Sequence, residues 1–238
     1  MKHSLEILKF VFLLGLLGFL FSFTKKRNDA RKITKVEVEF VNDDSPFITH
    51  NTVNKLLIQN HDKLTDIGKE ALVLREMEQR VLKNPMVRNA QVYVTVDAAL
   101  GVKIEQRKPI GRVSASPDYY IDSDGKAMPL SEVYSARVPL VTGSSDSNFT
   151  ELTSLLLKIR DDEFMQTSVV GLDRRKNGDI ELELRKTNLK VLFGAPKNID
   201  KKFKNFKAFY KKTKEDSTFF GYDKINLKFD SQVIATKK

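Results

Sequence analysis

The sequence contains no cysteine and only three histidines among its 238 residues. Without cysteine the chain can form no disulfide bond, no thiol nucleophile and no cysteine-based zinc site. The histidines do not suggest a metal site either, because His50 and His61 are 11 positions apart and no H-x-x-x-H or H-E-x-x-H pair occurs. We therefore expect neither a metal ion nor another cofactor in this protein.

Sequence patterns typical of catalysis are also scarce. No glycine-rich phosphate loop is present, and residues 143–145 (GSS) lack the context of a nucleophile elbow or a P-loop. The carboxylate pairs Asp161–Asp162 and Asp122–Asp124 stand in turn-like sequence, which favours solvated turns over acid–base chemistry. A serine–lysine dyad stays open as an alternative, because a lysine-rich chain offers many candidates. The sequence otherwise indicates that the protein is not an enzyme.

The composition is that of a folded protein with an uneven charge distribution. Apolar residues make up 41% of the chain, with only 11 glycines and 7 prolines, so neither disorder nor a fibrous structure is expected. The net charge is +10. Residues 185–238 hold 15 Lys and Arg against 5 Asp and Glu, whereas the remaining residues hold 26 of each sign. The excess therefore indicates an acidic partner, an anionic lipid surface or nucleic acid as a partner of the last quarter of the chain.

One long apolar run, Phe10–Phe23, has 14 residues without a charge. About 20 residues cross a bilayer, and Lys9 can reach the headgroups and thereby lengthen the run by about one turn. No small-residue cleavage site follows, so an uncleaved transmembrane anchor is favoured over a signal peptide or a buried helix. Two basic residues precede the run and five follow it within residues 25–32, which by itself would place the C-terminal body in the cytoplasm.

Apolar periodicity predicts the order strand–helix–helix–strand–strand up to Gln106. The expected strands cover residues 33–41, 87–96 and 102–106, and the expected helices begin at Thr49 and span residues 74–83. A polar loop is expected around residues 60–68. This order predicts a compact βααββ domain.

The second half of the chain predicts a β-rich domain with two or three helices. Helices are expected at residues 151–160 and 199–212, and strands at 119–121, 168–172, 179–185, 189–193 and 224–229. Asp124-Gly125 and Asn177-Gly178 indicate hairpin turns. The predicted fold class is therefore α+β, with an N-terminal transmembrane helix before the two domains.

Two surface features in the last quarter allow two interpretations each. The lysines of the helix at 199–212 form either a solvated face or a docking surface for an acidic partner; nucleic acid is disfavoured because the aromatic residues follow the core stripe. If the last strand closes a sheet, it is either an edge protected by its lysines or a site where a partner adds a further strand. The helix lysines are Lys201, Lys202, Lys204, Lys207, Lys211 and Lys212.

Several short segments resemble one known family. Residues 84–92 (NPMVRNAQV) and 104–110 (IEQRKPI) resemble the N-P-x-V-x-x-A-x-V and V-x-E-R-x-P-V segments of a POTRA (polypeptide-transport-associated) domain. Residues 120–125 (YIDSDG) and 137–143 (RVPLVTG) resemble the L-V-D-x-x-G and L-P-x-L-x-G segments of the FtsQ/DivIB family of bacterial cell-division proteins. The chain is similar to that family in its layout of tail, span, POTRA domain and β domain.

The resemblance implies a tail and anchor at residues 1–27, a POTRA-like domain at 28–112 and a C-terminal β domain at 113–238. It implies a non-enzymatic divisome scaffold in the cytoplasmic (inner) membrane, with its body on the extracytoplasmic side at the division septum. Such a scaffold links FtsB/DivIC-like and FtsL-like membrane proteins to the control of septal cell-wall synthesis. A POTRA-type chaperone or translocation accessory protein is the alternative.

The resemblance also implies two sets of contact residues. A partner segment would add as a strand near the end of the β domain, and a weaker contact would involve the POTRA face near Gln106. The first set is Lys224, Asn226, Lys228, Phe229, Ser231, Gln232, Val233 and Ile234. The second set is Gln106, Lys108, Ile110 and Arg112.

Overall fold

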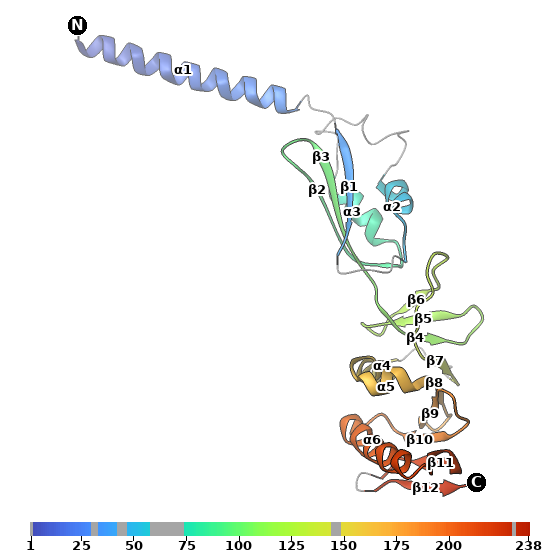
Figure 1. Cartoon of the computed structure of the whole chain (residues 1–238). Helices are drawn as coiled ribbons and strands as arrows, with labels where there is room; N and C mark the ends of the chain where they lie inside the picture. Colours follow the sequence, from blue (N-terminus) through green and yellow to red (C-terminus); the bar gives the residue numbers. More distant parts are fainter. Residues whose placement is uncertain (1, 30–32, 42–46, 58–73, 144–148, 230–231) are drawn as a thin grey trace. The chain divides into compact units, whose positions relative to one another are not determined.

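The computed structural model describes residues 2–29, 33–41, 47–57, 74–143, 149–229 and 232–238 (Figure 1). The chain divides into two compact units, residues 1–106 and 107–238. The division falls between Gln106 and Arg107, before the expected boundary after Arg112, because residues 109–113 form a strand in the sheet of the second unit.

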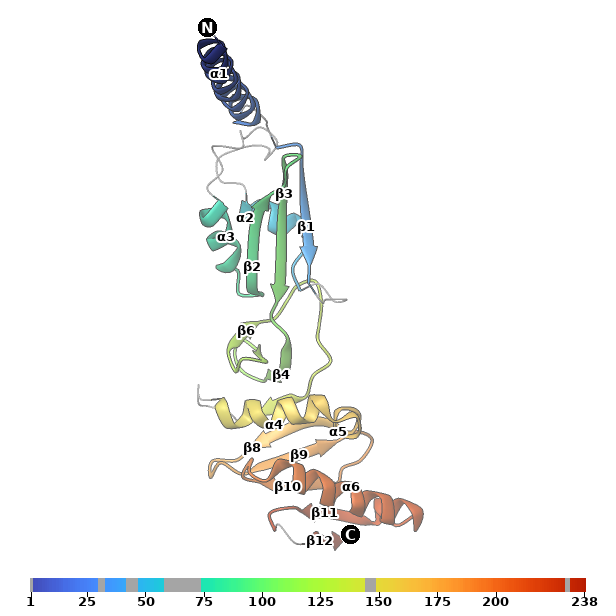
Figure 2. The same cartoon turned by 90° about the vertical axis from the view of Figure 1, so that its left-hand side faces the viewer.

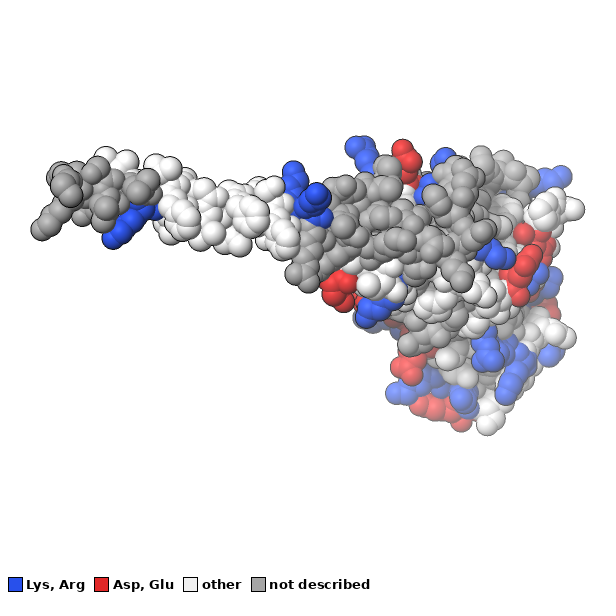
Figure 3. Space-filling view, turned by 90° about the horizontal axis from the view of Figure 1, so that it is seen from above, with Lys and Arg blue, Asp and Glu red and all other residues white. Residues whose placement is uncertain are grey.

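The first helix, α1, spans Lys2–Asp29. Its middle part carries no charged side chain, as Figure 3 shows, and Phe10, Phe12 and Phe21 are between 67% and 74% exposed. Among the helices of the described residues, none combines the length and the apolar character needed to cross a bilayer. The predicted transmembrane span from Phe10 to Phe23 is therefore not confirmed.

The first unit has the predicted βααββ order, which confirms the POTRA-like domain. Its elements are β1 (Lys35–Phe40), α2 (His50–Leu57), α3 (Leu74–Leu82), β2 (Val87–Val94) and β3 (Ala99–Gln106). The central strand β3 is parallel to β1 and antiparallel to β2. The hydroxyl oxygen of Thr49 accepts the N–H of Thr52 at 3.1 Å, which stabilises the start of α2 as a helix cap does. The polar loop expected around residues 60–68 lies outside the described residues.

Apolar side chains from both helices and from the sheet form the core of this unit. Val53, Leu57 and Val81 are fully buried on the helices, and Leu100 and Ile104 are fully buried on β3. The helical spacing of Val53 and Leu57 places them on the same face of α2. Burial of these two faces stabilises short helices that would be marginal in isolation.

The second unit is built on one nine-stranded sheet with the order β12-β11-β10-β9-β8-β7-β4-β5-β6. Its strands are β4 (Pro109–Val113), β5 (Tyr119–Asp122), β6 (Ala127–Pro129), β7 (Leu140–Thr142), β8 (Val169–Arg174), β9 (Ile180–Leu184), β10 (Lys190–Gly194), β11 (Tyr222–Asn226) and β12 (Ile234–Lys237). The helices are α4 (Thr150–Asp161), α5 (Glu163–Ser168), α6 (Ile199–Glu215) and the 3₁₀ helix η3 (Phe219–Gly221).

Both predicted hairpins are present. Gly125 and Gly178 have φ angles of 75° and 84°, a left-handed conformation that glycine adopts without strain. They lie in the antiparallel connections β5–β6 and β8–β9. Six elements were not among the predicted helices and strands, namely β4, β6, β7, α5, η3 and β12; all have six residues or fewer, too few to show a clear apolar period.

Helices α4, α5 and α6 cover one face of this sheet, as Figures 1 and 2 together show. Leu156, Phe193 and Phe206 are fully buried in the core between them and the strands. Two ion pairs fix α6 to the other helices: Lys207 Nζ lies 2.6 Å from Asp162 Oδ2, and Lys158 Nζ lies 2.8 Å from Asp200 Oδ1. These two pairs join the three helices in one layer on this face of the sheet.

Asp162 has a second role at the start of α5, because its side chain also accepts the N–H of Met165 at 3.1 Å. Partial desolvation raises the pKa of this carboxyl, but the bonds from Lys207 and Met165 outweigh that effect and lower the pKa below its ordinary value. The ionised carboxylate therefore both begins α5 and holds α6 in place.

Candidate functional site

The C-terminal edge of the nine-stranded sheet is β12. Strand β11 lies between β10 and β12, parallel to the first and antiparallel to the second. The N–H of Leu227 donates to the carbonyl oxygen of Leu192 in β10 at 2.8 Å. Because backbone groups alternate along a strand, the N–H and C=O of Ile225 also point towards β10, and those of Lys224 and Asn226 point towards β12. The strand predicted at residues 224–229 is therefore not the edge: it ends at Asn226 and is covered on both sides.

Strand β12 presents backbone groups that point away from the sheet. Thr236 and Ile234 are in register with Lys224 and Asn226, and their N–H and C=O groups face β11. The N–H and C=O groups of Ala235 and Lys237 consequently point outwards. In the part of the chain that the structure describes, no strand pairs with this outer side. It is an edge to which another strand can add.

Side chains at this edge divide between the two faces of the sheet. Val233 and Ala235 pack against the hydrophobic core. Ile234 is 44% exposed on the opposite face, in register with Asn226, and Phe229 is 46% exposed in the connection that leads to β12. Ile234 and Phe229 are thus apolar side chains that a strand docked on β12 could cover.

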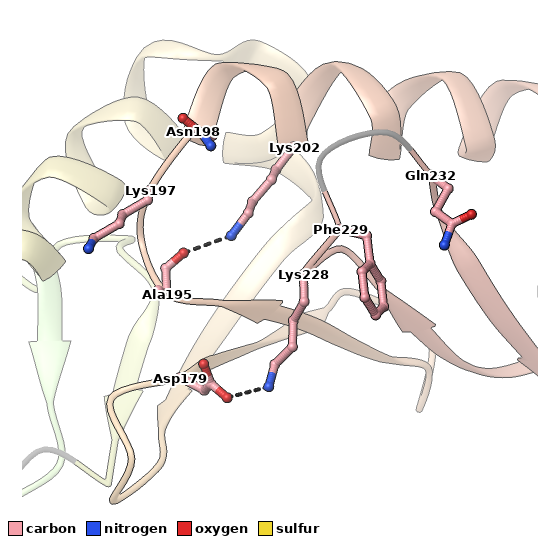
Figure 4. Close-up of a pocket in the computed structure, with 8 residues that line it drawn as sticks. All are labelled: Asp179, Ala195, Lys197, Asn198, Lys202, Lys228, Phe229 and Gln232. Atoms are coloured by element: carbon pink, nitrogen blue, oxygen red, sulfur yellow. Dashed lines mark hydrogen bonds and ion pairs between the residues drawn. The ribbon is translucent and has the colours of Figure 1, made fainter.

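An open pocket of 540 Å³ lies beside the connection between β11 and β12 (Figure 4). Three of the predicted contact residues, Lys228, Phe229 and Gln232, line it. The others come from the β8–β9 turn, from the segment between β10 and α6, and from the first turn of α6. These regions are far from the predicted residues in sequence, and no sequence pattern connected them. The complete lining is Asp179, Ala195, Lys197, Asn198, Lys202, Lys228, Phe229 and Gln232.

The charged groups of the pocket are held by specific bonds. Lys202 is 95% buried, and its Nζ donates to the carbonyl oxygens of Phe193 at 2.8 Å and Ala195 at 2.7 Å. Lys228 is bonded to Asp179, and this hydrogen bond holds the pKa of the Asp179 carboxyl below its ordinary value. The lining contains three lysines and one aspartate, so its charge favours an acidic or polar segment over a basic one.

The remaining residues of the first predicted set lie close to this edge. Lys224 and Asn226 are partly exposed in β11. Ser231 lies outside the described residues. The first set therefore gathers at β12 and the pocket, although the open backbone groups belong to Ala235 and Lys237, which the sequence did not single out.

The second predicted contact set is not a continuous exposed surface. Gln106 is 1% exposed and Ile110 is 2% exposed, so neither side chain can meet a partner at the surface. Arg112 is paired with Asp118, with Nη2 2.7 Å from Oδ2, and Lys108 is exposed. Both side chains lie in the interiors of their own units, which speaks against the contact role predicted for Gln106 and Ile110. The role of Lys108 and Arg112 stays a prediction.

We predict that Gln106→Leu destabilises the first unit. The side-chain oxygen of Gln106 accepts the N–H groups of Phe47 at 2.7 Å and Ile48 at 3.3 Å. Leucine would leave these buried donors without that acceptor, at a cost of roughly 1–3 kcal/mol in the free energy of unfolding. Urea unfolding followed by circular dichroism measures the loss. Gln91→Leu, at an exposed position of β2, is the matched control and should change stability little; equal effects would contradict the structural role of Gln106.

Within the described residues, no three His, Asp or Glu side chains are grouped so that they could hold a metal ion. The ring of His50 instead meets the ring of Phe40 edge to face, with 5.0 Å between the ring centroids. His61 lies outside the described residues.

Comparisons with known proteins agree with the two units. A family model described as FtsQ/DivIB, C-terminal related, matches residues 108–236, and a POTRA-like domain model matches residues 31–105. A relative, the cell division protein FtsQ of Salinibacter ruber (strain DSM 13855 / M31), is 24% identical over 172 residues, which cover 65% of this chain and 66% of that protein. The C-terminal match spans more than half of the chain, including the pocket and all of β12 except Lys237. The chain therefore belongs to the FtsQ/DivIB family.

Proposed function

We propose that this protein is a non-enzymatic scaffold of the division machinery that binds FtsB/DivIC-like and FtsL-like membrane proteins and so controls septal cell-wall synthesis. The observation that carries the proposal is the open edge of β12, where the backbone groups of Ala235 and Lys237 point outwards beside the pocket. Membership of the FtsQ/DivIB family supports the role in division.

In the proposed mechanism a segment of the FtsB/DivIC-like partner adds to β12 as a further strand. Main-chain hydrogen bonds to Ala235 and Lys237 supply affinity that depends little on the partner's sequence. Every second side chain of the added strand lies on the face of the sheet where Ile234 is exposed, which gives sequence selectivity. The cationic pocket beside Phe229 receives an acidic or polar part of the same segment.

A binding experiment on the full chain tests this mechanism. We expect a variant with Ile234→Lys and Phe229→Ser to bind the FtsB/DivIC-like protein at least about tenfold more weakly, because two apolar contacts at the edge are lost. The control is Val133→Lys, which alters a 54% exposed apolar side chain of the same unit, after β6 at the opposite edge of the sheet. Equal affinities for both variants would refute docking at β12.

The proposal places the protein in the cytoplasmic membrane at the septum, with α1 as its attachment and the body on the extracytoplasmic side. The supporting observation is the exposed apolar surface of Phe10–Phe23, which no described part of the chain covers. Attachment to the same membrane raises the effective concentration of membrane-bound partners without any new contact. This orientation follows the family topology and is opposite to the one that the basic residues flanking Phe10–Phe23 indicate.

The absence of cysteine allows a direct test of this orientation. We expect Lys176→Cys, at an exposed position of the β8–β9 turn, to react with a membrane-impermeant maleimide in intact cells. Lys2→Cys should react only after lysis, and the unmodified chain is the blank because it has no thiol. Labelling of Lys2→Cys but not Lys176→Cys in intact cells would reverse the orientation.

A POTRA-type chaperone is the second candidate function. It rests on the three-stranded sheet of the first unit, in which β1 and β2 are edge strands that could bind an extended client. Under this alternative, unfolded proteins of unrelated sequence would bind the chain, and changes at Ile234 and Phe229 would not reduce their binding.

A further inference from the structure

The outer face of α6 carries four lysines in a regular arrangement. At 100° per residue, Lys201 and Lys212 project within about 20° of each other around the helix axis, and so do Lys204 and Lys211. The two rows lie on either side of Ala208, which is exposed. Along the axis the rows are about 16 Å and 10 Å long. The result is a flat basic face about three turns long with a small side chain at its centre.

These four lysines differ from the other cations of the helical layer. Lys207 and Lys158 are neutralised by Asp162 and Asp200, and Lys202 is buried against backbone carbonyls. By contrast Lys201, Lys204, Lys211 and Lys212 are all exposed, and within the described residues none of them forms an ion pair. Like charges at neighbouring helical positions destabilise a helix slightly. The acidic residues near this face lie at its two ends: Asp200, which is paired with Lys158, and Glu215.

We propose that this basic face docks an acidic α-helix of a partner protein. Its length of three turns fits a helix with acidic residues one turn apart on one face. Ala208 lets the backbone of a crossing helix come close, while the lysine rows on both sides reach its carboxylates. Phe203 and Phe206 of α6 are buried in the core, and the Lys207 and Lys158 pairs link α6 to the other helices, so the four lysines stand on a packed helix.

The same face fits a membrane or a nucleic acid less well. An interfacial helix inserts an apolar stripe into the bilayer, but the apolar stripe of α6 is already occupied, with Phe203 and Phe206 buried in the core. Binding of single-stranded nucleic acid uses aromatic side chains between the basic ones, whereas the outward face of α6 has none. The docking surface is also separate from the outward backbone groups of Ala235 and Lys237, so it goes beyond the proposed function.

The test uses the full chain in detergent and two synthetic helical peptides of identical composition. One peptide carries its glutamates on a single face, and the other carries them all round the helix. The first protein variant replaces Lys201, Lys204, Lys211 and Lys212 by glutamine. The control variant replaces Lys55, Lys83, Lys126 and Lys176 by glutamine, so both variants lose the same charge. These four lysines are exposed and form no ion pair among the described residues. Fluorescence anisotropy at two salt concentrations measures binding.

We expect the single-face peptide to bind the unmodified chain more tightly than the other peptide, and the α6 variant to bind it at least about tenfold more weakly. The control variant should remain within about twofold, and Ala235→Pro should bind the peptide as the unmodified chain does. Equal losses in both lysine variants would overturn the proposal, since only net charge would then matter. The proposal would also be overturned if the α6 variant, but not the control variant, lost binding to phosphatidylglycerol vesicles or to DNA while both variants bound the peptide equally.

Discussion

Replacing Ala235 by proline is expected to lower the affinity for the FtsB/DivIC-like partner at least about tenfold, which corresponds to about 1.4 kcal/mol. Proline removes an N–H that points away from β11, and its ring obstructs the approach of an added strand. Because that N–H takes no part in the β11–β12 ladder, the free energy of unfolding should change by less than about 1 kcal/mol. Titration of the partner into the full-length variant measures the affinity.

Thr236→Pro is the matched control, one residue further along the same strand. The N–H of Thr236 faces β11, so its loss removes a ladder hydrogen bond and should cost roughly 1–3 kcal/mol in stability. Ala235→Pro is therefore expected to weaken partner binding, whereas Thr236→Pro is expected to lower the free energy of unfolding. If Ala235→Pro binds as tightly as the unmodified chain, the outer edge of β12 is not where the partner docks.

This comparison is more informative than removal of the last strand. Deleting β12 would uncover β11, whose Lys224 and Asn226 would then offer their backbone groups to the same partner segment. A cut as early as Phe220 would also remove β11, which pairs with β10. A single proline at an outward position leaves the sheet intact and removes one donor.

Phe206→Ala is expected to destabilise the second unit by roughly 3–5 kcal/mol. The ring of Phe206 is fully buried between α6 and the sheet and lies 6.0 Å from the ring of Phe164, measured between centroids. Alanine would leave a cavity that the surrounding rings cannot fill without moving, because Phe164 also contacts Tyr210 at 4.9 Å. Such a loss is a large part of the total stability of a domain. Urea unfolding followed by circular dichroism measures it.

Phe220→Ala provides the control for that experiment. It deletes the same ring at a position that is 68% exposed, so the expected change is below about 0.5 kcal/mol. The unfolding transition of the first unit should be unaffected by either substitution, since that unit has its own core. A comparable loss in both variants would show that burial of the Phe206 ring is not the cause of the destabilisation.

The amino-acid sequence by itself determined the local structure of most long elements. The alternation around Val36 and Val38 predicted β1, and the apolar spacing from Leu152 to Ile159 predicted α4. Asn177-Gly178 predicted the β8–β9 hairpin because this pair is typical of tight turns; in the structure Gly178 has the positive φ angle of the turn, 84°. The short segments at residues 84–92 and 104–110 indicated the POTRA-like domain, and those at residues 120–125 and 137–143 indicated the family. These predictions succeeded because each depends on residues that are neighbours in the chain.

The position of the candidate site, in contrast, was decided by the tertiary structure. Strand β12 has four residues, too few for a periodic pattern, and it exists because it pairs with β11 and packs Val233 and Ala235 on the core. Because of this pairing, the open edge of the sheet lies at Ala235 in β12 and not at the strand from Lys224 that the sequence suggested. Gln106 was predicted as a contact residue, but its side chain is buried and accepts a hydrogen bond from the backbone of a distant segment. Pairing and burial join residues far apart in sequence, so only the folded chain shows which side chains meet and which backbone groups remain open.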